Sequence, residues 1–83
     1  MAKVVIYSKS YCPYCDRAKS LFNAKNISYE EINVESDPET YTTLKQKTGL
    51  MTVPQIFIND KLIGGYTDLA ALDKKGALDP LLK

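Results

Sequence analysis

Cys12-Pro13-Tyr14-Cys15 is the stretch around which this chain of 83 residues is organised, and it holds the only two cysteines. It follows an apolar run at residues 4–7 and opens a pattern that predicts a helix over residues 13–25. In the first turn of a helix, residues three apart lie on the same face. Unpaired backbone N–H groups and the helix dipole there favour a thiolate over a thiol. The spacing therefore predicts an exposed nucleophilic sulfur with a second thiol close enough to attack the disulfide it forms.

A structural disulfide and half of a zinc site are the two other interpretations of these cysteines. Small disulfide-dependent domains usually carry more cysteines, and a bridge across so short a loop removes little chain entropy. Structural zinc normally takes four Cys or His ligands, and this chain has no histidine and no third cysteine. A Cys-x-x-Cys pair between a strand and a helix is typical of thioredoxin-like redox motifs. Redox chemistry is therefore the favoured interpretation.

Composition limits the class of protein and its partners. Apolar residues make up 45 % and charged residues 25 % of the chain, which is typical of a globular protein, and we expect residues 1–83 to form one domain. The net charge of +1 comes from 11 basic and 10 acidic residues spread along the chain, so we expect neither nucleic acid nor membrane as a partner. The first residues lack the apolar core of a signal peptide, and we expect a reducing, cytoplasmic setting.

The first half of the chain predicts a βαβ unit. Residues 4–7 are β-branched or aromatic and indicate a fully buried strand. In the helix that follows, Ala18, Leu21 and Phe22 share the inward stripe of Cys15, whereas Arg17 and Lys25 are expected on the solvated surface. Residues 27–34 read as a second strand, which should be parallel to the first.

The second half predicts a helix, a hairpin and two further helical segments. Ser36 or Asp37 is the expected cap of a helix that runs to about Lys47 and ends at Gly49, with Leu44 in the core. Residues 55–58 and 61–63 flank turn residues and predict an antiparallel hairpin. Thr67 or Asp68 is the expected cap of the next helix, and residues 78–82 form a last helical turn. The order indicates an α/β fold, a four-stranded mixed sheet with helices on both faces.

Three motifs at these distances resemble the glutaredoxin family over the whole length of the chain. They are Cys12-Pro13-Tyr14-Cys15, Thr52-Val53-Pro54-Gln55-Ile56-Phe57-Ile58 and Gly64-Gly65-Tyr66-Thr67-Asp68-Leu69. The compact size and the last residues are most similar to the small bacterial glutaredoxins. The resemblance implies a thioredoxin-like fold and an enzyme acting on disulfides that contain glutathione or are finally reduced by it.

The resemblance also implies roles for particular residues. Cys12 is the nucleophile and Cys15 the resolving thiol, and Val53 presents its backbone to the glutathione cysteine before a cis bond to Pro54. The remaining residues implied for the glutathione groove are Lys9, Tyr14, Thr52, Gly65, Tyr66, Thr67 and Asp68. Two of these roles agree with elementary electrostatics, since glutathione carries two carboxylates and both a cation and a helix N-terminus attract them.

Two positions depart from the pattern of the relatives. Tyr66 stands where some relatives carry a small residue or a cysteine, and its ring is expected to narrow the groove or stack on the ligand. Tyr41 stands where relatives often offer a polar or basic side chain to the glycine carboxylate, and Gln55 is a candidate for a substitute hydrogen bond.

The expected function is therefore glutathione-dependent thiol–disulfide exchange. We expect a monothiol route on protein–glutathione mixed disulfides through Cys12, and a dithiol route on protein disulfides through Cys12 and Cys15. Glutathione is the expected co-substrate, with no metal, and the partners are glutathionylated or disulfide-containing proteins, with ribonucleotide reductase as one candidate. The alternative is a dimer that binds an iron–sulfur cluster through Cys12 and glutathione, which Pro13 disfavours because it stiffens the turn. We otherwise expect a monomer.

Overall fold

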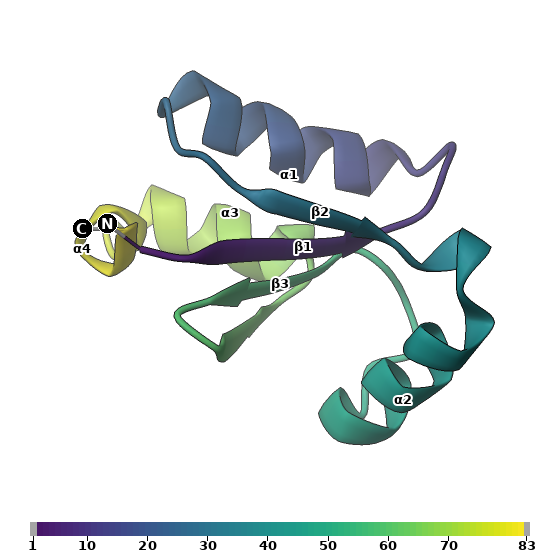
Figure 1. Ribbon diagram of the computed structural model, residues 1–83. Helices are drawn as coiled ribbons and strands as arrows, with labels where there is room; N and C mark the ends of the chain where they lie inside the picture. Colours follow the sequence, from purple (N-terminus) through teal and green to yellow (C-terminus); the bar gives the residue numbers. More distant parts are fainter. Residues whose placement is uncertain (1, 83) are drawn as a thin grey trace.

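Strand β1 (Val4–Ser8) lies inside a four-stranded sheet in the computed structural model, which describes residues 2–82 (Figure 1). The remaining elements are α1 (Pro13–Ala24), β2 (Glu30–Asn33), the 3-10 helix η1 (Val34–Ser36), α2 (Pro38–Thr48), β3 (Gln55–Ile58), β4 (Lys61–Gly64), α3 (Tyr66–Lys74) and α4 (Leu78–Leu82). The strand order is β2-β1-β3-β4. β1 pairs in parallel with β2 and antiparallel with β3, and β3 and β4 form a hairpin. The predicted βαβ unit, hairpin and mixed sheet are confirmed.

The core lies between one face of the sheet and the helices α1, α3 and α4. Apolar side chains of β1 and β3 meet side chains of those helices there, namely Val4, Ile6, Ala18, Phe22, Ile56, Ile58, Leu69, Leu78 and Leu82. The predicted inward stripe of α1 is confirmed, because Cys15, Ala18 and Phe22 are all buried. Burial of this stripe fixes α1 against the sheet, and with it the position of the two cysteines at its start.

The other face of the sheet carries α2 and is only partly covered. The expectation that residues 4–7 are fully buried is wrong, because burial alternates along β1 and leaves Val5 and Tyr7 partly exposed. Leu44 is the one buried side chain of α2, as predicted. Beside it an open groove runs along the sheet, with Val5, Tyr7 and Phe57 among its lining residues. The alternation arises because α2 extends away from the end of the sheet instead of lying along it (Figure 1).

The connection between α1 and β2 differs from the prediction. Asn26 adopts a left-handed conformation (φ 58°) just after α1, as its role as a stop predicts. The Ile27 N–H then donates to the Phe22 carbonyl oxygen at 2.9 Å, so this segment stays tied to the helix and the strand begins only at Glu30. At the other end Val34 turns into η1 with its side chain buried. The predicted strand over residues 27–34 is therefore shorter at both ends.

An ion-pair cluster joins the end of α1 to the end of α3 and the start of α4. The Lys25 ammonium lies 2.8 Å from a carboxylate oxygen of both Asp73 and Asp79. Both hydrogen bonds raise the pKa of Lys25, and the bond to Asp73 has the larger effect. Arg17 is exposed as predicted, and Lys25 lies partly exposed on the surface, where the ion pairs were not foreseen from the sequence. The cluster links α1 to α3 and α4.

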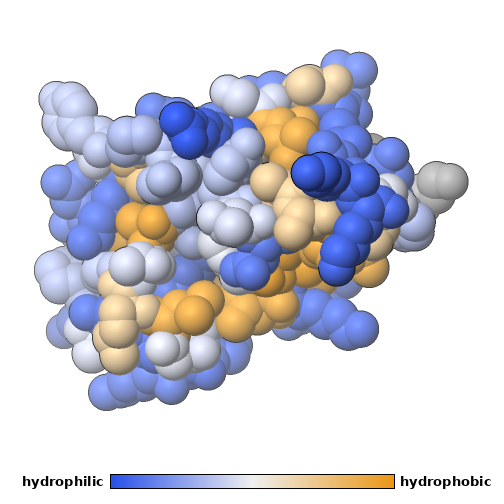
Figure 2. Space-filling view, turned by 180° about the vertical axis from the view of Figure 1, so that it is seen from behind, coloured by the Kyte–Doolittle hydropathy of each residue, from blue (hydrophilic) through white to orange (hydrophobic). Residues whose placement is uncertain are grey.

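The surface seen from behind is mostly hydrophilic, with apolar residues gathered in a stripe along its lower part (Figure 2). A groove beside β4 and α3 has Ile58, Leu62, Ile63 and Leu72 among its lining residues. Across residues 2–82, no helix combines the length and apolar character needed to cross a bilayer.

We predict that Phe22→Ala lowers the free energy of unfolding by about 3–5 kcal/mol, because it removes a ring that is 0 % exposed and leaves a cavity under α1. Urea unfolding followed by circular dichroism measures the loss. The matched control is Asn23→Ala, the exposed next residue of α1, with an expected change below about 0.5 kcal/mol. Equal effects of the two substitutions would contradict the placement of this core.

Candidate active site

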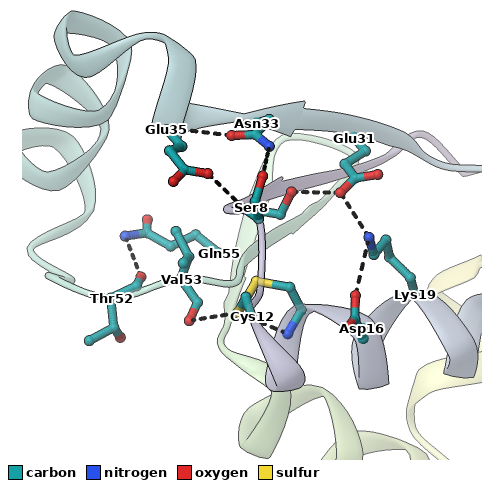
Figure 3. Close-up of a disulfide and its surroundings, with 12 residues drawn as sticks. Ser8, Cys12, Asp16, Lys19, Glu31, Asn33, Glu35, Thr52, Val53 and Gln55 are labelled. Atoms are coloured by element: carbon teal, nitrogen blue, oxygen red, sulfur yellow. Dashed lines mark hydrogen bonds and ion pairs between the residues drawn. A yellow bond between two sulfur atoms is a disulfide. The ribbon is translucent and has the colours of Figure 1, made fainter.

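Cys12 and Cys15 form a disulfide at the start of α1, with their Cα atoms 5.2 Å apart (Figure 3). The two sulfurs differ in environment, since Cys12 is partly exposed and Cys15 is only 1 % exposed. A reagent in solution therefore reaches the Cys12 sulfur first, while the protein shields the Cys15 sulfur behind it.

Cys12 is the N-cap of α1. Its backbone is extended (φ −110°, ψ 102°), and its Sγ accepts a hydrogen bond from the Cys15 N–H at 3.2 Å. Pro13 occupies the first turn, where a missing N–H costs no intrahelical bond, as predicted. A sulfur in this position accepts from a backbone donor and faces the positive end of the helix dipole, and both interactions are stronger for a thiolate than for a thiol.

The loop that leads into Cys12 is held by the end of β2 and by η1. The Ser10 N–H donates to the Glu35 carboxylate at 3.2 Å, and the Asn33 amide donates to the Ser10 hydroxyl oxygen at 3.3 Å (Figure 3). Tyr11 follows with a positive φ of 56°, a left-handed conformation that costs energy for a side chain with a Cβ. These bonds fix the backbone on one side of the sulfur.

Lys9 lies over an aromatic ring of α2. Its ammonium is 4.4 Å from the centroid of the Tyr41 ring, and the Lys45 ammonium is at the same distance from that centroid. The Tyr41 hydroxyl donates to the Met51 carbonyl oxygen at 2.8 Å. The Tyr41 ring thus contacts two cations, and the Tyr41 hydroxyl anchors the loop after α2. Because the hydroxyl proton is used in that bond, it is not available to donate to a ligand.

The loop before β3 brings its backbone to the disulfide. The Val53 carbonyl oxygen lies 3.9 Å from the Cys12 Sγ, and the bond from Val53 to Pro54 is cis, as the resemblance implied (Figure 3). Pro54 is buried, Val53 is partly exposed and Thr52 is exposed. An exposed backbone edge next to a reactive sulfur suits an extended peptide-like ligand.

Gln55 is not available to a ligand, so its suggested hydrogen bond to glutathione is wrong. The side chain is 0 % exposed and is fully used inside the protein. Its amide donates to the carbonyl oxygens of Leu50 (3.0 Å) and Thr52 (3.1 Å), and its oxygen accepts from the Thr48 hydroxyl at 2.9 Å. Gln55 instead shapes the loop that carries Thr52 and Val53.

Helix α3 begins earlier than predicted. Gly65 is its N-cap and Tyr66 its first residue, so neither Thr67 nor Asp68 is the cap. The Asp68 carboxylate reaches back to accept from the Gly65 N–H at 3.1 Å. Gly64 has a φ of 118°, and a Cβ there would overlap the Asp68 carboxylate, so this close turn requires glycine.

The start of α3 faces the cysteine motif through two aromatic rings. The ring of Tyr66 lies 6.2 Å from that of Tyr14, with the planes inclined at 31°. Tyr14 is exposed, and the Arg17 guanidinium lies over its ring, 5.2 Å from the ring centroid. The structure therefore brings the motifs of residues 12–15, 52–54 and 64–68 to one end of the sheet.

A polar network beneath the first turns of α1 was not found from the sequence. Ser8 is fully buried, and its hydroxyl donates to Glu31 at 2.7 Å; the Lys19 ammonium lies 3.0 Å from the same carboxylate oxygen (Figure 3). The bonds from Ser8 and, next in size, from Lys19 lower the pKa of Glu31. In the sequence, the only sign of this network is that a serine, Ser8, ends an apolar strand.

Among residues 2–82, no group of three or more His, Cys, Asp or Glu side chains is placed to hold a metal ion.

Comparison with known proteins identifies the family. The family model for glutaredoxin matches residues 4–63. Glutaredoxin 3 of Escherichia coli is 48 % identical over 83 residues, with full coverage of both chains. The chain belongs to the glutaredoxin family. A glutaredoxin of Pseudomonas aeruginosa is 46 % identical, over 99 % of this chain and 98 % of its own. The crystal structure of a buckwheat glutaredoxin–glutathione complex superposes with a TM-score of 0.93 at 36 % identity, covering 98 % of this chain and 76 % of the other.

Family membership establishes the type of chemistry. The chain is a thiol–disulfide oxidoreductase with a thioredoxin-like fold, and the Cys12–Cys15 pair is its redox-active disulfide. In glutaredoxins as in other oxidoreductases of this type, the geometry around the first sulfur decides which thiol reacts.

We predict that Glu31→Gln lowers stability by about 0.5–1 kcal/mol at neutral pH, the range for a partly exposed charged pair. The pKa of Glu31 is depressed in the folded state, so its contribution exists above the ordinary carboxyl pKa and is lost as the pH falls through the folded value. The gap to the unmodified protein should therefore narrow as the pH is lowered below the ordinary carboxyl range and through the depressed pKa of Glu31.

Urea unfolding at neutral pH and at a series of acidic pH values measures this gap. The control is Glu30→Gln, at the exposed neighbour of Glu31 in β2. A gap that stays constant on acidification would show that the charge of Glu31 is not involved.

Proposed function

We propose that the protein reduces protein–glutathione mixed disulfides with glutathione as the electron donor, and protein disulfides through both cysteines. The observation that carries this proposal is the asymmetry of the pair. The Cys12 Sγ is partly exposed and accepts the Cys15 N–H at the helix start, whereas Cys15 is buried behind it. One sulfur is thus suited to attack an incoming disulfide and the other to resolve the product.

The monothiol route uses Cys12 alone. Its thiolate attacks the glutathione sulfur of the mixed disulfide, so the bond from Cys12 to glutathione forms and the protein thiolate leaves and takes up a proton. A second glutathione thiolate then attacks the glutathione sulfur on Cys12, releasing oxidised glutathione and restoring the Cys12 thiolate. Stabilising that thiolate makes Cys12 a better leaving group in the second step, because a thiol of lower pKa leaves faster.

The dithiol route adds Cys15. Cys12 attacks a protein disulfide, one protein thiolate leaves, and the remaining mixed disulfide is attacked by Cys15 at the Cys12 sulfur. The second protein thiolate then leaves, and the product is the Cys12–Cys15 disulfide. Two glutathione molecules reduce this bridge in two further exchanges. The short Cα separation of 5.2 Å suits such a transfer.

The proposed glutathione groove runs from the end of α2 across the disulfide to the start of α3. Its residues are Lys9, Tyr14, Thr52, Val53, Pro54, Gly65, Tyr66, Thr67 and Asp68. The Lys9 ammonium suits one carboxylate of the tripeptide, and the first turn of α3 suits the other, with the Asp68 carboxylate near its amine. The glutathione complex of the buckwheat relative supports this choice of ligand.

We further infer that the protein is a cytoplasmic monomer, with residues 1–83 as one domain. A dithiol donor of this kind suits reductases that form a disulfide in each turnover, and ribonucleotide reductase is the candidate we propose. These assignments rest on the resemblance to small bacterial glutaredoxins.

We predict that Cys12→Ser abolishes reduction of a glutathionylated peptide, because the attacking sulfur is lost. Cys15→Ser should keep at least about half of that activity and lose reduction of protein disulfides, since only the second route needs a resolving thiol. Steady-state assays with glutathione, glutathione reductase and NADPH measure both reactions. Equal loss of the monothiol activity in the two variants would refute the assignment of roles.

A further inference from the structure

Large apolar side chains are exposed around the disulfide. Among residues 2–82 five such side chains are exposed: Tyr11, Tyr14, Met51, Leu62 and Leu81. The first three belong to the segments that frame the active site: Tyr11 precedes Cys12, Tyr14 lies between the cysteines, and Met51 lies two residues before Val53. Tyr11 is 101 % exposed and Met51 is 68 % exposed, so these two side chains contribute almost nothing to the core.

The backbone holds both side chains outward. Tyr11 has a φ of 56°, and the residue before it is fixed by the bonds of Ser10 to Asn33 and Glu35. The Met51 carbonyl oxygen is held by the Tyr41 hydroxyl. A bulky residue in a left-handed conformation is uncommon, and such strain concentrates at functional sites. The fold therefore holds Tyr11 outward at an energetic cost, and a hydrogen bond fixes the backbone at Met51.

Three cations lie near the rim formed by Tyr11, Tyr14 and Met51, together with the Glu35 carboxylate that accepts from the Ser10 N–H. Lys9 and Lys45 lie over the Tyr41 ring, and Arg17 lies over the Tyr14 ring. In the described part of the chain, the cations of the ion pairs are Lys19 and Lys25, whereas these three contact aromatic rings. The rim thus combines apolar area with cations that an acidic partner can neutralise.

Thiol–disulfide exchange determines what reaches this rim. In the attack on a mixed disulfide, the three sulfurs lie roughly in line, with the glutathione sulfur in the middle and the protein sulfur beyond it. When glutathione occupies the groove of residues 52–68, the polypeptide carrying the leaving sulfur lies on the outside. The residues available to it there are the exposed ones that precede Cys12 and Val53.

We propose that Tyr11 and Met51, with Lys45, form a docking surface for the polypeptide of the glutathionylated substrate. The preferred partner is an extended segment with an apolar and an acidic residue beside its modified cysteine. This inference rests on the proposed deglutathionylation and specifies its substrate. The apolar residue packs on Tyr11 or Met51, and the carboxylate approaches the Lys45 ammonium.

The test compares three substrates. Two are glutathionylated peptides of equal length, with Leu and Asp beside the cysteine in one and Ser and Lys in the other. The third is the mixed disulfide of glutathione and 2-mercaptoethanol, which is too small to reach the rim. The protein should prefer the Leu/Asp peptide over the Ser/Lys peptide by about tenfold in kcat/KM, the ratio expected for burial of part of one apolar side chain.

The combined change of Tyr11→Asn and Met51→Ser should lower this preference by about threefold or more, leave the part that Lys45 supplies, and keep the small substrate within about twofold. Asn tolerates the left-handed conformation at position 11, so the loop is kept. Leu62→Ser, an exposed apolar residue of β4, is the matched control and should change none of the rates. The preference of the unmodified protein should also fall between about 0.05 M and about 0.5 M salt.

Three outcomes would overturn the inference. They are the absence of a preference in the unmodified protein, a preference that either the double change or high salt leaves undiminished, and an equal loss on all three substrates. Inactivity of the unmodified protein on every glutathione disulfide would instead refute the proposed function, so the two failures are distinguishable.

Discussion

The hydrogen bond from the Cys15 N–H to the Cys12 sulfur is the interaction on which the chemistry of this protein depends. This bond makes Cys12 the N-cap of α1, because its sulfur accepts the hydrogen bond that a Ser or Asp side-chain oxygen accepts in an ordinary N-cap. The helix terminus would otherwise leave that donor unpaired. The same three-residue spacing that lets the second cysteine reach the first also places its backbone donor at the correct distance. Catalytic pairing and thiolate stabilisation thus come from one local geometry.

The rest of the fold keeps that helix start in place and brings partners to it. Cys15, Ala18 and Phe22 bury one stripe of α1 against the sheet, and the network of Ser8, Glu31 and Lys19 supports the helix from below. Three loops then converge on the sulfur from different parts of the chain. One is braced by η1, one is shaped by the buried amide of Gln55, and one turns tightly at Gly64. The side chain of Gln55 is buried, where an unmade hydrogen bond is costly, whereas Glu35 and Asp68 hold their loops from the surface.

Residue patterns and the family resemblance predicted the mixed sheet with its βαβ unit and hairpin, the helix starts at Pro13 and Pro38, and the meeting of the three motifs. The errors have physical causes. Alternating burial in β1 depends on how far α2 extends past the sheet, which no local pattern encodes. The cap of α3 was misplaced because glycine gives no side-chain signal, while Asp68 serves the same terminus from inside the helix. The roles of Gln55 and Glu31 depend on contacts between residues distant in the fold, such as Ser8 with Glu31. Sequence spacing cannot specify such contacts.

The central claim is that the folded helix start stabilises the Cys12 thiolate. It is tested most directly by the rate of iodoacetamide alkylation against pH in the reduced Cys15→Ser variant, which retains the backbone donor and leaves one thiol. The same titration is repeated in concentrated urea. In the folded protein the midpoint should lie well below the value of about 8.5 for a free thiol, and it should return to that value on unfolding. The same midpoint in the folded and unfolded protein would contradict the account.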